Sequence, residues 1–334
     1  MHHSVPMVEI WRGGHLESVH CGHAVVCEPS GQIIDAWGDP DQLIFPRSSC
    51  KMLQALPLVE SGAAEAFGLT QAHLALACAS HSGAAIHTDK VADWLVTLGL
   101  SESDFRCGPQ WPSDIPARED LTRSGARPCQ IHNNCSGKHS GFLTLTKHIG
   151  GGAEYIDPEH PIQRMVKAAH DEMCGMEAPG FGIDGCSAPN FMTSVQGLAA
   201  SMAKMAAPNL GAARDAAAKR LVSAMIEHAE LVAGQGRACT ELMRASDGRA
   251  AVKTGAEAVF VGILPDRKLG FAVKISDGGT RAAEASAAGL LMRYGALDPH
   301  HPVAKKWAHG PIRNRRNIVT GEMRFASSFL GDKR

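Results

Sequence analysis

Two short strings of this sequence combine a hydroxyl with lysine amines in a spacing that suits nucleophilic catalysis. The first is Ser48-Ser49-Cys50-Lys51, and the second, far downstream, is Lys253-Thr254-Gly255. In a Ser-x-x-Lys string on a helix the serine is the nucleophile, and the lysine one turn later takes its proton. A Lys-Thr-Gly string on a strand brings a second lysine to the same pocket. The pair predicts cleavage of an amide or ester through a covalent acyl-enzyme.

Short motifs also occur by chance, and Ser201-Met202-Ala203-Lys204 repeats the first spacing within this chain. The surroundings separate the two strings. Ser201 lies in a helical pattern of apolar residues, where it would be an ordinary helix-face serine. Ser48 follows Pro46-Arg47 and precedes an apolar run, which predicts the first turn of a helix after a strand. The free N–H groups of such a turn can hold an oxyanion or a carboxylate.

Composition and charge exclude several classes of protein. The 334 residues, 44% of them hydrophobic, suffice for one large domain or two smaller ones. A net charge of −1 and a pI near 7.0 give no electrostatic footprint for nucleic acid or anionic membranes. The sequence shows neither an apolar run of transmembrane length nor a secretory signal. We therefore expect a cytoplasmic protein that binds no nucleic acid and no membrane, with ten reduced cysteines.

Hydrophobic periodicity predicts strands at both ends of the chain and helices between them. Residues 8–37 predict an antiparallel meander, and residues 47–59 predict the helix that begins beside Ser48. Further helices are predicted at 70–80, 91–98, 160–174, 193–206, 212–232 and 281–294, strands at 256–264 and 269–275, and irregular structure at 103–130.

This order of elements predicts an α/β (α+β) fold, with a mainly antiparallel sheet flanked by helices plus a helical lobe. The whole of 1–334 would form a single unit. Its sheet lobe would comprise about 1–60 and 250–334, and its helical lobe about 61–249.

Two polar, glycine-containing loops carry other reactive side chains. They are the strings 133–141 and 182–190, and each contains one central cysteine, Cys135 or Cys186. Two such thiols would make a soft site of the kind that zinc favours. Taken alone, the string 133–141 is better explained as a capped helix start with a buried cysteine. Candidates for a third ligand are Lys138, His139 or a more distant residue.

All of these strings occur in one order along one chain, and together they resemble the class 3 L-asparaginases, or asparaginase II family. The matching strings are Phe45–Lys51, Cys78–Gly83, His132–His139, Asp184-Gly185-Cys186 and Lys253-Thr254-Gly255. The resemblance extends over about residues 8–325. It implies a serine β-lactamase/glutaminase-like fold, a homodimer, and hydrolysis of L-asparagine to L-aspartate and ammonia.

The resemblance also implies roles for individual residues. Two Ser–Lys tandems would share one site, Ser48 with Lys51 and Ser80 with Lys253. One zinc ion per subunit would bind Cys135, Lys138 and Cys186, with water in the open position. Implied substrate contacts are Arg47, His139 and Asp184, and Cys239 would line the pocket. The chain is shorter than some family members before Lys253, so the match at Cys239 rests on fewer residues.

A lysine acts as a base only when it is neutral, so its pKa near 10.4 must be lowered by burial or by nearby positive charge. Lys51 and Lys253 in one pocket would disfavour each other's protonation, and zinc would act in the same direction. We expect Ser48 to attack with Lys51 as its base, while Ser80 and Lys253 relay a proton to ammonia. The reverse assignment, with Ser80 as nucleophile, stays open. Substrate recognition needs a cation such as Arg47 for the α-carboxylate and an anion such as Asp184 for the α-ammonium.

Other functions also stay open. A glutaminase substrate differs by one methylene, which a hydrophobic slot discriminates by only about 1–3 kcal/mol. A β-lactam-type serine hydrolase or transpeptidase would also use Ser–Lys chemistry, but the sequence has no evident Ser-Asp-Asn string and no export signal. A non-catalytic sensor of amino acids or zinc would not need both serine–lysine pairs.

Overall fold

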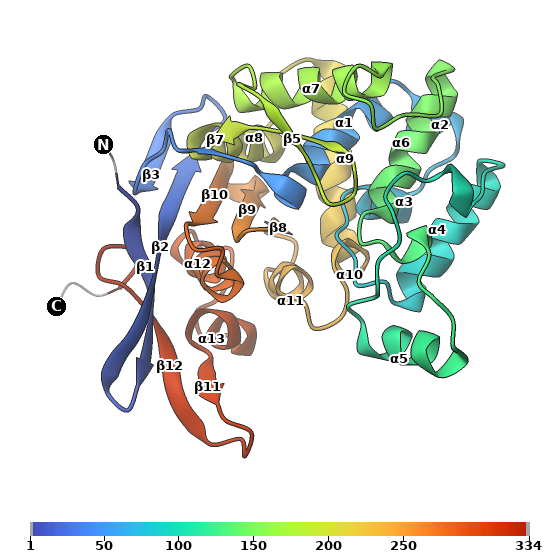
Figure 1. The fold of residues 1–334 in the computed structure, drawn as a ribbon. Coiled ribbons are helices and arrows are strands. Elements are labelled where there is room, and N and C mark those ends of the chain that lie inside the picture. The colour runs from blue at the N-terminus through green and yellow to red at the C-terminus, as the bar shows by residue number, and fades with distance from the viewer. Residues whose placement is uncertain (1–2, 332–334) are drawn as a thin grey trace.

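Segments from the two ends of the chain form the strands of one antiparallel sheet. The computed structural model describes residues 3–331, and within them this sheet has eight strands in the order β11-β12-β1-β2-β10-β9-β8, with β3 also paired to β2 (Figure 1). The strands are β1 (Val5–Arg12), β2 (His15–Cys27), β3 (Ile33–Trp37), β8 (Ala251–Gly255), β9 (Val259–Leu264), β10 (Leu269–Ile275), β11 (Pro311–Arg313) and β12 (Val319–Phe325). Residues 1, 2 and 332–334 of the predicted single unit lie outside the described part.

The two ends of the chain meet in this sheet. Strand β2 pairs with both β1 and β3, which forms the predicted meander. Strand β12 pairs with the other edge of β1, and β10 pairs with β2. The strand predicted at 256–264 begins only at Val259, because Glu257 and Ala258 adopt positive φ angles of 58° and 55° in a turn.

Helices cover both faces of the sheet, and a further group of helices forms a lobe beside it. Helix α8 packs on β10, β2 and β9, and α12 packs against the opposite face (Figure 1). The helices are α1 (Lys51–Glu60), α2 (Ala63–Ala66), α3 (Gln71–Ala77), α4 (Ala85–Thr97), α5 (Ile115–Ser124), α6 (Ser136–Ile149), α7 (Pro161–Cys174), α8 (Val195–Ala206), α9 (Ala212–Glu227), α10 (Ala229–Val232), α11 (Ala238–Ala245), α12 (Thr280–Arg293) and α13 (Pro302–His309), with 3-10 turns η1 (Arg47–Cys50), η2 (Glu102–Asp104), η3 (Gln130–His132) and η4 (Pro265–Arg267). The predicted mixed fold is confirmed.

The prediction of irregular structure throughout residues 103–130 was wrong, because α5 lies within them. The Asp114 side chain caps this helix by accepting the Ala117 N–H at 3.0 Å, and Gly125 ends it with a φ of 68°. None of its residues is buried, so no apolar stripe marks it in the sequence.

Helix α1 and two short sheets position the first motif. Every residue of α1 from Lys51 to Val59 is buried, because α6, α7 and α9 surround it. Strand β4 (Leu43–Ile44) pairs with β7 (Thr193–Ser194) just before η1, and β5 (Phe181–Ile183) pairs with β6 (Pro189–Phe191) to present the loop of Cys186. The start of α1 is therefore fixed on both sides by long-range contacts.

The contact between β10 and α8 gives a prediction about stability. A Cβ on Gly270 would overlap backbone atoms of Met202 and Ala203 in α8. We expect Gly270→Ala to lower the free energy of unfolding by about 1–3 kcal/mol, because backbone atoms cannot rotate out of the way. Gly152→Ala is the matched control, since a Cβ there has no neighbour within 4 Å. Urea unfolding of both variants measures the difference, and equal midpoints would contradict the close packing.

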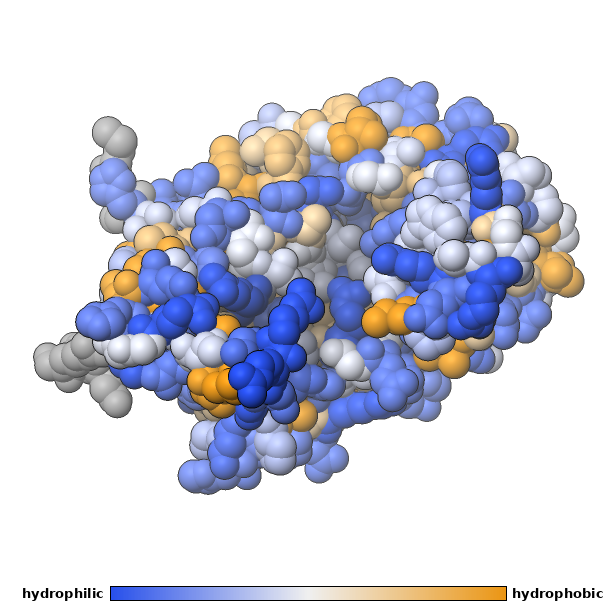
Figure 2. All heavy atoms as spheres, turned by 60° about the horizontal axis from the view of Figure 1, so that its bottom comes forward, coloured by the Kyte–Doolittle hydropathy of each residue, from blue (hydrophilic) through white to orange (hydrophobic). Residues whose placement is uncertain are grey.

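Hydrophilic side chains predominate on the face of the molecule in Figure 2, and hydrophobic side chains form separate small patches there. Within residues 3–331 no helix combines the length and apolar character needed to span a bilayer.

Candidate active site

Ser80 lies between two buried lysines that come from different parts of the fold. Lys51, at the start of α1, and Lys253, in the middle of β8, are 1% and 0% exposed. The Ser80 Oγ is 3.1 Å from Lys51 Nζ and 2.8 Å from Lys253 Nζ. Lys51 also donates to the carbonyl of Ala79, and Lys253 donates to the Thr254 carbonyl at 2.8 Å. Both lysines of the sequence motifs therefore meet at one hydroxyl.

Burial and, second, the positive charge of Lys51 together lower the pKa of Lys253 to about 7. At neutral pH a large fraction of Lys253 is therefore neutral, and it can accept a proton from Ser80. This is the arrangement that a Ser–Lys base requires.

Ser48 lies at the more accessible edge of this cluster. It belongs to the turn η1 and is partly exposed, whereas Ser80 is 7% exposed. Among residues 3–331 no hydrogen bond joins Ser48 to Lys51, whose ammonium faces Ser80. The residue before Ser48, Arg47, has a left-handed φ of 53°, a conformation that costs a non-glycine residue about 1–3 kcal/mol and is concentrated at functional sites.

Arg47 and Asp184 form an ion pair. The guanidinium donates from Nε and Nη2 to Asp184 Oδ1, at 3.1 and 2.7 Å. The Asn190 side chain accepts the Arg47 backbone N–H at 3.3 Å, which ties η1 to strand β6. Sequence reasoning assigned no role to Asn190, although it closes the polar loop 182–190.

The two predicted metal-site thiols lie against lysines. Lys51 Nζ is 3.1 Å from Cys135 Sγ, and Lys138 Nζ is 3.1 Å from Cys186 Sγ. A hydrogen bond from Cys135 and the charge of Lys138 hold the pKa of Cys186 well below its usual range. Burial opposes the charge of Lys138, but the neighbouring Cys186 and Cys135 sulfurs raise its pKa overall. The cluster thus contains a thiolate–ammonium pair.

His139 supports this pair from the protein interior. It is fully buried, and its Nδ1 is 2.8 Å from the Tyr155 hydroxyl. Because Tyr155 accepts the Arg106 N–H at 2.8 Å, its own proton is free to bind Nδ1, which leaves the ring proton on Nε2. Nε2 is buried and has no hydrogen-bond partner within residues 3–331, while the proximity of His139 helps to lower the pKa of the Cys186 thiol. Tyr155 was not identified from the sequence, because only the fold brings it to His139.

Cys239 lies directly behind the Lys-Thr-Gly strand. Its Sγ accepts the Thr254 N–H at 3.2 Å, and the residue is 1% exposed. Burial raises the pKa of this thiol. It is therefore a neutral thiol that fixes β8 next to Lys253.

No set of three or more His, Cys, Asp or Glu side chains within residues 3–331 is arranged to hold a metal ion. A metal bound by Cys135 and Cys186 would therefore need a different third donor. Lys138 is the amine in contact with one of these sulfurs.

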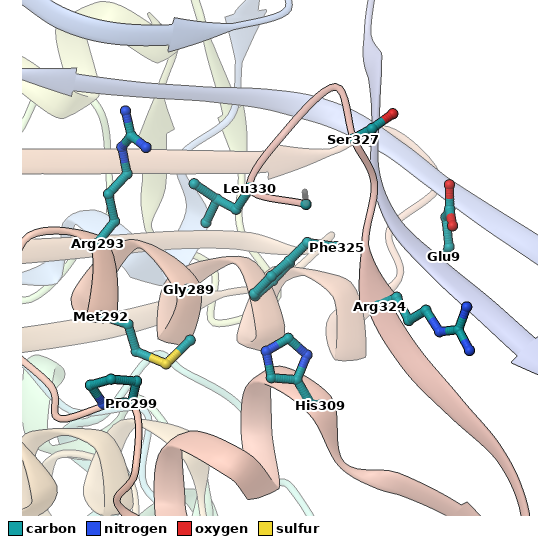
Figure 3. Close-up of a pocket in the computed structure, with 11 residues that line it drawn as sticks. Glu9, Gly289, Met292, Arg293, Pro299, His309, Arg324, Phe325, Ser327 and Leu330 are labelled. Atoms are coloured by element: carbon teal, nitrogen blue, oxygen red, sulfur yellow. The ribbon is translucent and has the colours of Figure 1, made fainter. Parts of the chain in front are cut away.

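Two cavities lie outside the Ser–Lys cluster. One of about 850 Å³ is lined by residues of β1, α12, α13 and β12, with His309 and Phe325 at its centre and none of the predicted site residues (Figure 3). The other, of about 440 Å³, includes in its lining Arg47, the residue that precedes Ser48 in the chain.

Comparison with known proteins gives a family and several distant structures. The family model for L-asparaginase II matches residues 8–325. The native form of the protein Mglu is 14% identical, with 84% of this chain and 65% of that chain covered and a TM-score of 0.48, so the chain spans 65% of the length of Mglu. A β-lactamase from Mycobacterium bovis is 14% identical, with coverages of 82% and 94% and a TM-score of 0.45. No curated protein sequence gives a significant match.

Proposed function

The chain belongs to the L-asparaginase II family, and from this premise we propose that it hydrolyses L-asparagine to L-aspartate and ammonia. Family membership confirms the resemblance found in the sequence and supports an amide hydrolase. The observation that carries the proposed chemistry is the position of Ser80 Oγ, within 3.1 Å of both Lys51 and Lys253.

Ser48 attacks the side-chain carboxamide carbon in this proposal. Ser48 is partly exposed next to Arg47, whereas Ser80 is enclosed by two lysines, so Ser48 is the serine that a substrate reaches. When substrate binding brings the two side chains together, Lys51 takes this proton as it gives one of its own to Ser80, whose hydroxyl proton moves to the neutral Lys253. The acyl-enzyme ester forms as the carbon–nitrogen bond breaks.

Ser80 serves as the proton relay between the two lysines. Its single hydroxyl can accept from Lys51 while it donates to a neutral Lys253. The proton that leaves Ser48 can thereby reach the departing ammonia, and a second pass through the same groups activates the water that hydrolyses the ester. The low pKa of Lys253 supports this direction of transfer.

In this proposal the Arg47–Asp184 pair binds the charged groups on the α-carbon of the substrate. Arg47 Nη1 is not engaged by Asp184 and is available for the α-carboxylate, while Asp184 Oδ2 is available for the α-ammonium. The buried His139 and Cys239 then act by holding Cys186 and β8 in place.

Zinc fits the cluster formed by Cys135, Cys186 and Lys138. Two soft sulfurs lie beside an amine, and the Lys138 ammonium already supplies the positive charge that the Cys186 thiolate requires. We propose that these three residues hold one zinc ion, which would supply positive charge close to Lys51 and the bound substrate. The homodimer that the family resemblance implies is still a prediction.

Zinc binding is expected to release protons. Cys135 and Lys138 must each lose a proton before they coordinate, since both have raised pKa values. Zinc affinity measured by calorimetry should therefore fall steeply as the pH is lowered. The difference in binding enthalpy between two buffers of different ionisation enthalpy gives the number of protons released. Cys186→Ser should abolish binding, and Cys129→Ser, outside the cluster, should retain it. Equal zinc content in both variants, measured by native mass spectrometry, would argue against these ligands.

The pH profile should follow Lys253. Because its pKa is about 7 and the neutral amine is the active form, kcat/KM for L-asparagine should rise as the pH increases through about 7 and then level off. Below that pH the lysine is protonated and cannot accept the Ser80 proton. Initial rates of ammonia release between pH 5 and 9 measure this rise in kcat/KM. A kcat/KM independent of pH across this range would exclude Lys253 as a proton acceptor.

The proposed function is tested by ammonia release from purified protein with L-asparagine and, in parallel, L-glutamine. We expect release from L-asparagine with a higher kcat/KM than from L-glutamine. Preferential release from L-glutamine would make the protein a glutaminase. Turnover of nitrocefin without ammonia release from either amide would instead favour a β-lactam hydrolase, and binding of asparagine without turnover would favour a sensor.

A further inference from the structure

The cavity of about 440 Å³ beside Arg47 is larger than free asparagine requires. Its volume lies in the range of pockets that bind drug-sized molecules. Arg47 joins it to the catalytic turn, because the next residue is Ser48. A substrate held at Arg47 therefore has space to continue away from the reacting amide.

The sheet register places this cavity on the same face as the catalytic lysine. Lys253 and Gly255 alternate onto one face of β8, Gly255 pairs with Val259, and Val259 pairs with Lys274 on β10. Lys274 in turn pairs with His23 on β2. Since neighbouring strands are about 4.8 Å apart, β10 lies about 10 Å from β8. Lys274 and His23 thus lie two and three strands away from Lys253 on this face.

Two of the cavity's nitrogen groups are available to a ligand. Lys274 Nζ donates to the Glu257 carbonyl and forms no ion pair with any residue between 3 and 331, so two of its three N–H groups remain. His23 Nδ1 accepts the Asp39 N–H at 2.8 Å, so the ring proton lies on Nε2, which can donate. Arg47 uses Nε and Nη2 for Asp184, which leaves Nη1 for the group on the α-carbon of the asparagine residue.

We propose that this cavity extends the active site to dipeptides with an N-terminal asparagine, whose free C-terminal carboxylate binds Lys274 and His23. This inference rests on the proposed function. One added residue lengthens the substrate by about 3.3–3.6 Å toward β10. The reaction is unchanged: water adds across the side-chain amide, the carbon–nitrogen bond breaks, ammonia leaves, and the peptide bond stays intact.

The cavity walls also define the second residue of the dipeptide. Leu43 and Phe45 are 42% and 41% exposed along one wall and would bury an apolar side chain. Glu257 also lines the cavity, and its negative charge would disfavour an acidic side chain on the second residue, whereas the terminal carboxylate has Lys274 to offset that charge. Asparaginyl-leucine should therefore be a better substrate than asparaginyl-glutamate.

The test compares asparaginyl-leucine, its C-terminal amide and free L-asparagine as substrates. Ammonia release gives the rate, and mass spectrometry identifies aspartyl-leucine as the product against an enzyme-free control for spontaneous deamidation. We expect the wild type to hydrolyse asparaginyl-leucine with a kcat/KM about tenfold above that of its amide, because hydrogen bonds to a charged carboxylate are lost in the amide. In Lys274→Met, the ratio of kcat/KM for asparaginyl-leucine to that for asparagine should fall about tenfold, chiefly through KM.

Lys219→Met, an exposed lysine of α9, should leave this ratio unchanged. Hydrolysis of asparagine but not of asparaginyl-leucine would overturn the extended site and leave the proposed function intact. Failure to hydrolyse either substrate would reject the proposed function itself. An unchanged ratio in Lys274→Met, in a variant with wild-type circular dichroism, would also overturn the assignment of the carboxylate to Lys274.

Discussion

Ser48→Ala is expected to lower kcat for L-asparagine by at least about 10⁴-fold, the size of effect seen when a serine hydrolase loses its nucleophile. No acyl-enzyme can form without this hydroxyl, while the Ser80 relay and the Arg47–Asp184 pair remain in place. Substrate binding should therefore survive, which calorimetry with L-asparagine can measure. Intact-protein mass spectrometry of acid-quenched reactions should show an aspartyl adduct in the wild type and in Ser80→Ala, but not in Ser48→Ala.

The chain supplies its own control for this experiment. Ser201 begins a second Ser-x-x-Lys string, but it is fully buried in α8 and donates to the Leu198 carbonyl at 2.7 Å. Ser201→Ala should retain wild-type kcat. A covalent adduct that persists in Ser48→Ala and disappears in Ser80→Ala would exchange the two roles and make Ser80 the nucleophile.

Lys253→Met should have the second-largest effect, a loss of about 10³-fold in kcat, since general acid–base groups contribute about 10²–10⁴-fold. Methionine retains the apolar stem of the buried side chain and removes the amine that contacts Ser80 Oγ at 2.8 Å. With that amine absent, Ser80 has no neutral base to receive its proton. Because the variant buries no charge, its melting temperature should equal or exceed that of the wild type.

Lys204→Met is the matched control, because Lys204 ends the second Ser-x-x-Lys string and, within the described part of the chain, donates to the Glu172 carbonyl alone, at 2.9 Å. Its kcat should remain within about twofold of the wild-type value, as expected for a surface substitution. Lys253→Met with wild-type kcat would remove Lys253 from the mechanism. A reduced kcat accompanied by a lowered melting temperature in Lys253→Met would instead indicate damage to the fold.

Several elements could be predicted because their signals are local. The strand 269–275 and the helix 160–174 follow from periodicity and turn residues, and the structure places them at Leu269–Ile275 and Pro161–Cys174. Helix α13 and strand β12 were not predicted. Every residue of β12 is exposed or partly buried, so its sequence has little apolar contrast, and its pairing with β1 spans nearly the whole chain.

The sequence by itself identified the candidate catalytic and metal-binding residues, because motif identity and spacing are local properties. Ser48 and Lys51 are one helical turn apart in any helix, and the strings around Cys135 and Lys253 need no fold to be found. Only the tertiary structure decided what each group contacts. Lys51 bonds to Ser80 and not to Ser48, and Lys253 titrates near 7 because packing buries it beside Lys51. Contacts between distant segments and the loss of water around a charge depend on the whole fold, so no string of residues specifies them.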